Sequence, residues 1–273
     1  TPTMDWNSAI AVEPLGEGSF RAHVDEHWRS LQGVHGGIVA ALAVRASESV
    51  VAGLGADPST SLRSATFGYV RGNVIGDIDL EVDVVRQGRN LVSTHVRTVQ
   101  DGRTTTVARL HHSPPWDGAA FSDVEPPPSR PEETVPLRWG DEPAHLNNVE
   151  THLHPDTTMF AGAERAEWLA WSRPMEPGAD GRRTFDHAWL TMFGDYFPPA
   201  VFTRATEPAR AVTIEYSIQI HHAEPTWTLE SDEFLTARMH AVHSHDGFAV
   251  EDGWIWLPDG SLLATTRQTR LAG

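Results

Sequence analysis

The sequence predicts an α+β protein built from two similar halves, each an antiparallel sheet wrapped around one long helix. Three observations point to this fold class. Each half contains one long helical segment followed by strands of alternating polarity, the order of these elements repeats, and a proline-rich stretch separates the two copies. With 273 residues, 40% of them hydrophobic, the chain is long enough to bury a core in each half.

Each half holds one candidate helix ahead of its strands. In the first half it is GGIVAALAVRASESVVAGL, which begins at Gly36 and is rich in alanine, leucine and valine. Gly53 and Gly55 are expected to end this helix. In the second half the candidate is TFDHAWLTMFGDYF, which begins at Thr184. Thr184 or Asp186 can cap its start, and Pro198–Pro199 is expected to stop it.

Alternating apolar and polar residues predict three strands in the first half and four in the second. The predicted strands are Asp77–Val85, Leu91–Val99, Thr104–His111, Val212–His221, Phe234–His243, Phe248–Leu257 and Leu262–Thr269. Strands with one apolar face need a partner to bury it. The long helix of each half meets that need.

The two halves also resemble each other residue by residue. Each contains an Asp-Gly turn followed by a β-rich run, and a similar strand lies upstream of it. The aligned pairs are Asp101 with Asp259, Arg109 with Arg267, Thr66 with Thr213, and Tyr69 with Tyr216. The spacing between strand and turn is longer in the second half, and we expect its extra residues around His222–Glu233.

A proline-rich segment divides the chain. Eight of the 19 prolines lie between Pro114 and Pro143. Such a segment cannot form a helix or a central strand, so it predicts an extended linker on the surface. The predicted division is an N-terminal unit at 1–112, a linker at 113–157 and a C-terminal unit at 158–273.

The charge and composition exclude several classes of protein. The formal net charge is −16, and all 21 basic residues are arginine. An acidic chain repels nucleic acids and anionic membrane surfaces, so we expect neither as a partner. The N-terminal residues lack the pattern of a signal peptide, and the longest apolar run, Ile38–Val44, is too short to span a membrane. We expect a cytoplasmic protein.

No metal site is expected. The chain has no cysteine, which removes disulfides, thiolate ligands and a thiol nucleophile. Among the 15 histidines, His240, His243 and His245 cluster most closely. On a strand only His243 and His245 would share a face, whereas zinc needs three or four convergent ligands.

Three stretches carry a resemblance to a known family. They are WRSLQGVHGGIVAALAVRA (Trp28–Ala46), DHAWLTMFGDYFPPAVF (Asp186–Phe202), and VTIEYSIQIH (Val212–His221) together with DGSLLATTRQ (Asp259–Gln268). In this order they resemble the TesB-like acyl-CoA thioesterase II family of the double hotdog thioesterases. The resemblance implies two tandem hotdog units, each a sheet around a central helix, with the catalytic residues in the C-terminal unit.

The resemblance also implies an active site. In that family an aspartate, a threonine or serine, and a glutamine hold the water that attacks a thioester. The matching residues here are Asp195, Thr213 and Gln268. With no cysteine and no Gly-X-Ser-X-Gly motif, a covalent route has no support in the sequence.

Substrate-binding residues are expected at the start of the first helix and within the second. His35, Gly36 and Gly37 precede and open the first helix, whose unpaired N–H groups can stabilise an oxyanion. Glycines there let a carbonyl group approach closely. Trp189 is the best candidate for lining an acyl tunnel, because it lies on the second helix near Asp195.

The predicted function is hydrolysis of a medium- to long-chain fatty acyl-CoA to free acid and CoA, without cofactor or metal. Two alternatives stay open: a non-catalytic double hotdog protein that binds acyl-CoA or lipid, and a hotdog enoyl-CoA hydratase. The hydratase signature Gly-Asp-X-Asn-Pro is absent from the sequence. The fold alone does not decide between them. Pairing of sheet edges also allows a homo-oligomer.

Overall fold

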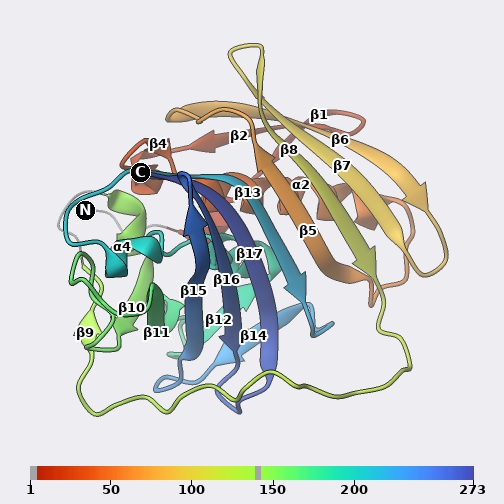
Figure 1. Cartoon of the computed structure of the whole chain (residues 1–273). Coiled ribbons are helices and arrows are strands. Elements are labelled where there is room, and N and C mark those ends of the chain that lie inside the picture. The colour runs from red at the N-terminus through yellow and green to blue at the C-terminus, as the bar shows by residue number, and fades with distance from the viewer. Residues whose placement is uncertain (1–4, 139–142) are drawn as a thin grey trace.

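The computed structural model describes residues 5–138 and 143–273. Residues 1–4, in the predicted N-terminal unit, and 139–142, in the predicted linker, lie outside the described residues. The described chain forms one large antiparallel sheet with helices packed against it (Figure 1).

The first half contains a strongly curved set of strands and one long helix. Its elements are α1 (Trp6–Ala9), β1 (Glu13–Gly16), β2 (Ser19–Val24), η1 (Glu26–Trp28), β3 (Arg29–Ser30), β4 (Gly33–Val34), α2 (Gly36–Gly53), β5 (Ser61–Tyr69), β6 (Gly76–Gln87), β7 (Val92–Gln100) and β8 (Arg103–Ser113). The run Ile38–Val44 in α2 is at most 2% exposed, because it packs against the sheet. The predicted first helix is confirmed as the core helix of this half.

The second half has more strands and shorter helices. Its elements are β9 (Val135–Pro136), η2 (Ala144–Asn148), β10 (Val149–Leu153), β11 (Glu167–Pro174), β12 (Arg183–Asp186), α3 (His187–Gly194), α4 (Val201–Arg204), β13 (Ala211–Ile220), β14 (Thr226–Leu229), β15 (Leu235–His245), β16 (Phe248–Trp256) and β17 (Leu262–Ala272). The four strands predicted here are observed as β13, β15, β16 and β17, and the extra residues expected around His222–Glu233 contain β14.

The second helix is shorter than the sequence predicts. Thr184 and Phe185 belong to β12, where Phe185 pairs with Trp227 of β14. Asp186 is the N-cap, and its carboxylate accepts a hydrogen bond from the Trp189 backbone N–H at 2.9 Å. The helix then ends at Gly194. Among the described residues, a long helix is therefore present in the first half only, as α2, and its counterpart α3 in the second half has eight residues.

One sheet of 13 strands runs through both halves in the order β1-β2-β6-β7-β8-β5-β13-β17-β16-β15-β11-β10-β9. The halves join at β5 and β13, where Ser64–Gly68 pairs with Glu215–Gln219 around a central pair, Thr66 and Ser217. A two-fold relation through that centre aligns the halves with an offset of 151 residues, from Thr66 to Ser217.

Two β-bulges support this alignment and correct the one made from sequence. The pairing shifts between Leu62 and Ser64 in β5, and between Thr213 and Glu215 in β13. These bulges fall at equivalent places under the same offset. The counterpart of Thr213 is therefore Leu62, and not Thr66 as residue similarity suggested.

The connection between the halves is extended but shorter than predicted. From Pro114 to Thr134 it forms no helix or strand, and it crosses the whole width of the molecule along its lower edge (Figure 1). Within the range 113–157 predicted as a linker, β9, η2 and β10 already belong to the second half, because β10 pairs with β11 and β9.

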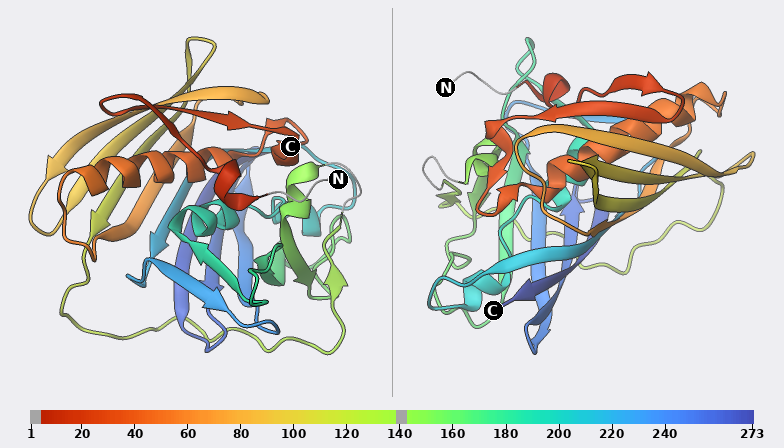
Figure 2. Two further views of the ribbon diagram at one scale, coloured as in Figure 1. Left: turned by 180° about the vertical axis from the view of Figure 1, so that it is seen from behind. Right: turned by 90° about the horizontal axis from the view of Figure 1, so that it is seen from above.

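Helices α2 and α3 lie side by side in opposite directions (Figure 2). The start of α2 therefore meets the end of α3. Gly37 makes the contact close, since a Cβ there would lie 2.7 Å from the Met192 carbonyl oxygen. By length and composition α2 could also span a membrane, but 61% of it is buried inside this protein. Its apolar character is accounted for by the core it fills.

Candidate active site

Asp195 lies where the end of α3 meets the start of α2. It is the C-cap of α3 and only 5% exposed. Its Oδ2 atom lies so close to Gly36 that a Cβ on Gly36 would be 2.9 Å away, which explains why a glycine stands there. The Tyr69 hydroxyl donates to the same oxygen at 3.4 Å. A buried carboxyl group therefore faces the N–H groups that open α2.

The environment of Asp195 favours its protonated form. Burial raises the pKa of this carboxyl to about 7. The nearby Arg270 guanidinium lowers this pKa, and the Glu251 carboxylate raises it. A carboxyl group with a pKa near neutrality can accept a proton at working pH and return it afterwards. An ordinary surface aspartate is too weak a base for this role.

A β-bulge brings Thr213 to the same face of the sheet as Gln268. Gln268 pairs with Tyr216, and Thr213 pairs with Arg270 because Ile214 is the extra residue between them. Side chains alternate along a strand, so without this bulge Thr213 would point to the opposite face. With it, the Thr213 hydroxyl donates to Gln268 Oε1 at 2.9 Å.

The three residues predicted as catalytic are thus brought together. The Gln268 side chain is 2% exposed, and its Nε2 donates to the Gly194 carbonyl oxygen at 3.4 Å. Its amide also supplies a hydrogen bond that lowers the pKa of Asp195. Asp195, Gln268 and Thr213 therefore form a connected polar chain at the junction of α3, β13 and β17.

Two charged residues that the sequence analysis missed extend this chain. Arg270 donates to the Thr213 hydroxyl oxygen at 2.7 Å and to Glu251 at 2.9 Å. Glu251 in turn accepts a hydrogen bond from the Ala200 backbone N–H at 2.6 Å. Both charges are buried. Period-two alternation from Gln268 already places Arg270 on the same face, so this residue could have been found in the sequence.

His35 holds the backbone of Asp195. Its Nε2–H donates to the Asp195 carbonyl oxygen at 2.9 Å, and its ring stacks on His145 at a centroid distance of 4.2 Å. Burial, and the nearby His145, keep the pKa of His35 well below its usual value, while burial lowers that of His145 to about 4. Both rings are neutral at pH 7. The Nδ1 atom of His35 is buried without a hydrogen-bond partner.

Trp189 lies in the core of the second half. It is 2% exposed, and its ring stacks on Phe193 at 4.9 Å and lies 5.0 Å from that of Phe185. It is six residues before Asp195 on α3, so the two side chains leave the helix in different directions. Its predicted contact with an acyl chain stays a prediction.

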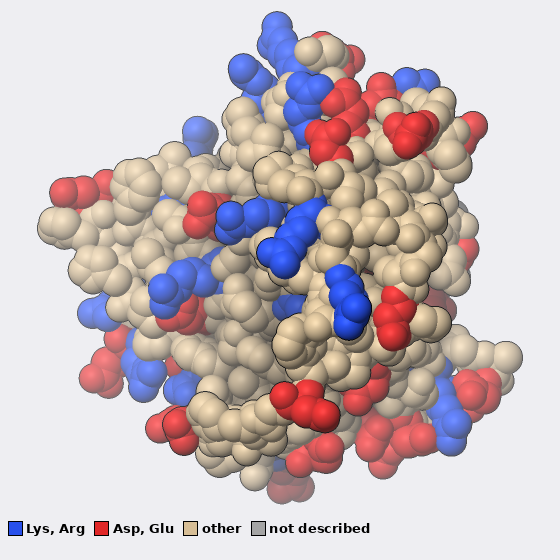
Figure 3. Space-filling view, turned by 90° about the vertical axis from the view of Figure 1, so that its right-hand side faces the viewer, with Lys and Arg blue, Asp and Glu red and all other residues tan. Residues whose placement is uncertain are grey.

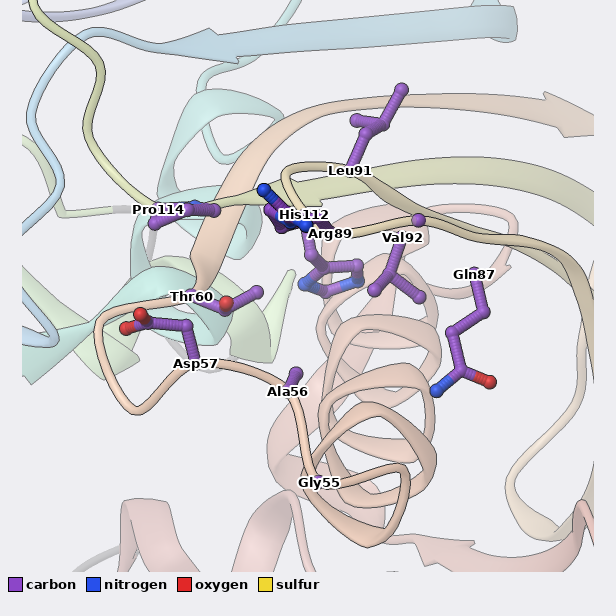
Figure 4. A pocket seen from close by; sticks show the side chains of 11 residues that line it. Gly55, Ala56, Asp57, Thr60, Gln87, Arg89, Leu91, Val92, His112 and Pro114 are labelled. Carbon is purple, nitrogen blue, oxygen red and sulfur yellow. The ribbon is translucent and has the colours of Figure 1, made fainter.

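Two cavities occupy equivalent places in the two halves. One, of about 380 Å³, is lined by residues that include Gln32 and the exposed Val212 and Leu271, on the outer face of β13 and β17. The other, of about 490 Å³, lies at the far end of α2, with Arg89 and His112 in its wall (Figure 4). Neither cavity is lined by Asp195, Thr213 or Gln268.

The described residues contain no group of three or more His, Asp or Glu side chains placed to hold a metal ion. Arginine and acidic side chains are interspersed on the face drawn in Figure 3. Several arginines of the described chain form ion pairs, such as Arg97 with Glu81 and Arg238 with Glu167.

Two family profiles match most of the chain. The profile of the acyl-CoA thioesterase N-terminal domain matches residues 24–112, and that of the C-terminal domain matches residues 121–272. The chain belongs to the acyl-CoA thioesterase family, which makes it a hydrolase of the TesB-like group. A search of curated proteins gave no match.

Solved structures show that the fold is a hotdog fold. A conserved hotdog protein of unknown function from Alicyclobacillus acidocaldarius is 20% identical, with a TM-score of 0.84 over 99% of this chain and 98% of that one. The acyl-CoA thioesterase II TesB2 from Mycobacterium marinum is 16% identical, with a TM-score of 0.74 over 98% and 97%. The tesB protein of Mycobacterium avium subspecies paratuberculosis is 16% identical, with a TM-score of 0.74 over 97% of both chains.

Proposed function

We propose that this protein is a double hotdog thioesterase that hydrolyses medium- to long-chain fatty acyl-CoA, with Asp195 as the general base. The observation that carries the proposal is the buried Asp195 carboxyl. Its pKa is raised to about 7, and it lies against the start of α2 with the Gln268 amide as a hydrogen-bond donor. The reaction proposed here uses this carboxyl, a water molecule and backbone N–H groups.

In the proposed reaction Asp195 takes a proton from a water molecule as the water oxygen attacks the thioester carbonyl carbon. The negative charge that develops on the carbonyl oxygen is stabilised by backbone N–H groups at the start of α2. The C–S bond then breaks, and the proton held by Asp195 passes to the departing sulfur. One water is consumed, and a fatty acid and CoA are released.

The other residues hold this geometry. Gln268 orients the water through its amide, and Thr213 fixes Gln268 through the hydrogen bond at 2.9 Å. His35 holds the carbonyl oxygen of Asp195 at 2.9 Å and so fixes the end of α3 relative to α2. We also propose that the cytoplasm is the site of action of this enzyme.

The first test is release of CoA thiol from saturated acyl-CoAs of graded chain length, followed with a thiol reagent. The chain has no cysteine, so it contributes no background to this assay. We expect turnover that is greatest in the medium- to long-chain range. Asp195→Asn removes the base but keeps the size of the side chain, so kcat should fall by roughly 10³-fold.

The stability of the Asp195→Asn variant is the control for its expected loss of activity. The folded-state pKa of Asp195 lies above the ordinary value of 3.8. Its contribution to stability is therefore present at low pH and is lost as the pH rises toward 7. Asp195→Asn should be at least as stable as the wild type at pH 8, measured by thermal unfolding. Loss of activity in a folded variant then reports on chemistry.

Other outcomes would favour the alternatives. Saturable binding of acyl-CoA without thiol release at any chain length would indicate a binding protein. Hydration of an enoyl-CoA, seen as loss of the conjugated double bond without thiol release, would indicate a hydratase. Full thiol release by Asp195→Asn would leave a hydrolase but remove Asp195 as its base.

A further inference from the structure

The hydrogen-bond chain behind Gln268 has a fixed direction. A guanidinium group can only donate hydrogen bonds, so Arg270 donates to the Thr213 oxygen at 2.7 Å. Thr213 has a single hydroxyl hydrogen, and that hydrogen is directed to Gln268 Oε1. The oxygen end of the Gln268 amide is thereby held toward Thr213, and its NH₂ end is turned toward Gly194 and Asp195.

Without the arginine, Thr213 would no longer fix this direction. A free Thr213 hydroxyl can donate or accept, so it could also accept a hydrogen bond from a flipped Gln268 amide. The flipped amide would present its oxygen to the Gly194 carbonyl and the Asp195 carboxyl, where both groups repel it. The water beside Asp195 would then lose its donor.

We infer that Arg270 is a positioning residue which, through Thr213, fixes the Gln268 amide with its NH₂ group toward Asp195. This inference rests on the proposed function, because it assigns Arg270 a task in the same site. Thr213 then acts on Gln268 and has no hydrogen left to donate to the water. That differs from the role expected from the sequence, in which Thr213 contacts the water directly.

Glu251 anchors the arginine. It is 2% exposed, it binds Arg270 at 2.9 Å, and its second oxygen accepts the Ala200 N–H at 2.6 Å. Burying an ion pair is costly unless its geometry and hydrogen bonds are good. Here the pair joins β16, β17 and the segment after α3, so it fixes Arg270 relative to the strand that bears Gln268.

The equivalent position in the first half lacks this chain. Leu62 pairs with His112 just as Thr213 pairs with Arg270, so His112 is the counterpart of the arginine. Two residues earlier, Leu110 takes the place of Gln268. The Arg270 chain is therefore a property of the half that carries Asp195, and the hotdog scaffold does not require it.

The main test compares the double variant Arg270→Met/Glu251→Leu with the wild type and with Gln268→Leu. Removing both charges together leaves no unpaired ion in the core. We expect kcat to fall at least about 10-fold, since misplacing a hydrogen-bond donor costs that much or more. In the Gln268→Leu background the same change should have no further effect on kcat when kcat is measured well above the pKa of Asp195, where the direct influence of Arg270 and Glu251 on that pKa no longer matters. Additive losses would overturn the inference and indicate a merely structural role.

Arg270→Lys is a second variant that keeps the charge opposite Glu251 and therefore protects the fold. One ammonium group cannot reproduce the guanidinium fork that serves Glu251 and Thr213 at once. This variant should also lose about 10-fold or more in kcat. The matched control is Arg267→Met, on the outer face of the same strand, where Arg267 pairs with Asp252. It should leave kcat unchanged.

A readout independent of activity separates this inference from the proposed function. The chain contains five glutamines, so ¹⁵N-glutamine labelling gives five side-chain amide signals, and Gln268→Leu identifies one of them. In the wild type the Gln268 NH₂ protons should exchange slowly with solvent. In Arg270→Lys they should exchange faster or show two orientations. Unchanged exchange would overturn the inference, whether or not the wild type hydrolyses acyl-CoA.

Discussion

The two halves of this protein share an equivalent set of backbone positions on two paired strands, but different side chains occupy them. In the second half the position holds Thr213, Gln268 and Arg270, all in one hydrogen-bond chain. Its counterparts in the first half are Leu62, Leu110 and His112, two of them fully buried apolar residues. The bulge is present in both halves. The scaffold thus positions side chains, and a few substitutions decide whether a site exists.

The first half uses its remaining polar residues for structure. The Ser47 hydroxyl lies 2.8 Å from His112 Nε2 and 2.7 Å from the Thr94 hydroxyl, and all three residues are at most 1% exposed. Burial lowers the pKa of His112 to about 4, so the ring stays neutral. These groups satisfy one another inside the core, whereas Asp195 faces the start of a helix.

The largest effect we expect in this comparison comes from making the second half resemble the first. Gln268→Leu places the residue found at Leu110 into the site and removes the donor beside Asp195. The expected loss is about 100-fold in kcat for acyl-CoA hydrolysis, as for other single donors in active sites. Gln219→Leu, on the exposed face of β13, is the control. Equal activities of the two variants would contradict the proposed role of Gln268.

A smaller effect is expected from Gly36→Ala. The added Cβ would lie 2.9 Å from Asp195 Oδ2 and 3.0 Å from the Tyr69 ring, so the carboxyl must move. We expect kcat to fall by roughly 10-fold. The control is Gly53→Ala at the other end of α2, where a Cβ meets nothing within 4 Å. That change should stabilise the helix by about 1 kcal/mol and leave kcat as it is. If both variants keep full activity, the contact with Gly36 is unimportant.

The smallest effect on activity is expected from Ser47→Ala in the first half. This change breaks two buried hydrogen bonds and should lower the free energy of unfolding by about 1–3 kcal/mol. Because the first half has no counterpart of the Gln268 chain, kcat should stay within twofold of the wild type. Denaturant unfolding and thiol release measure the two quantities. A large loss of kcat in a folded variant would show that the first half also contributes to turnover.

The sequence indicated the three residues of the candidate site, but it did not indicate Glu251, which supports them. Helix α2 and most strands follow from apolar runs and alternation, which are local signals, and the family resemblance supplied Asp195, Thr213 and Gln268. The bulge at Ile214 could not be read in advance, because the pairing of β13 with β17 decides it. For the same reason Glu251 became visible only when the sheet placed it opposite Gln268.

At the second helix, a local sequence signal predicted the wrong start. Helix propensity favoured a start at Thr184, but Thr184 and Phe185 extend as β12 because β14 pairs with them. Tertiary pairing overrode a local preference there. The shorter helix nevertheless ends at Gly194 with Asp195 as its C-cap, which places the carboxyl at the start of α2.

The central claim is that a buried aspartate with a raised pKa acts as the base, and the pH dependence of kcat/KM tests it most directly. Asp195 must be ionised to accept a proton, so its pKa of about 7 sets the acid limb of the profile. We predict that kcat/KM for acyl-CoA hydrolysis rises about tenfold per pH unit below that pKa and levels off above it. A profile that stays flat between about pH 5 and pH 8 would contradict this account.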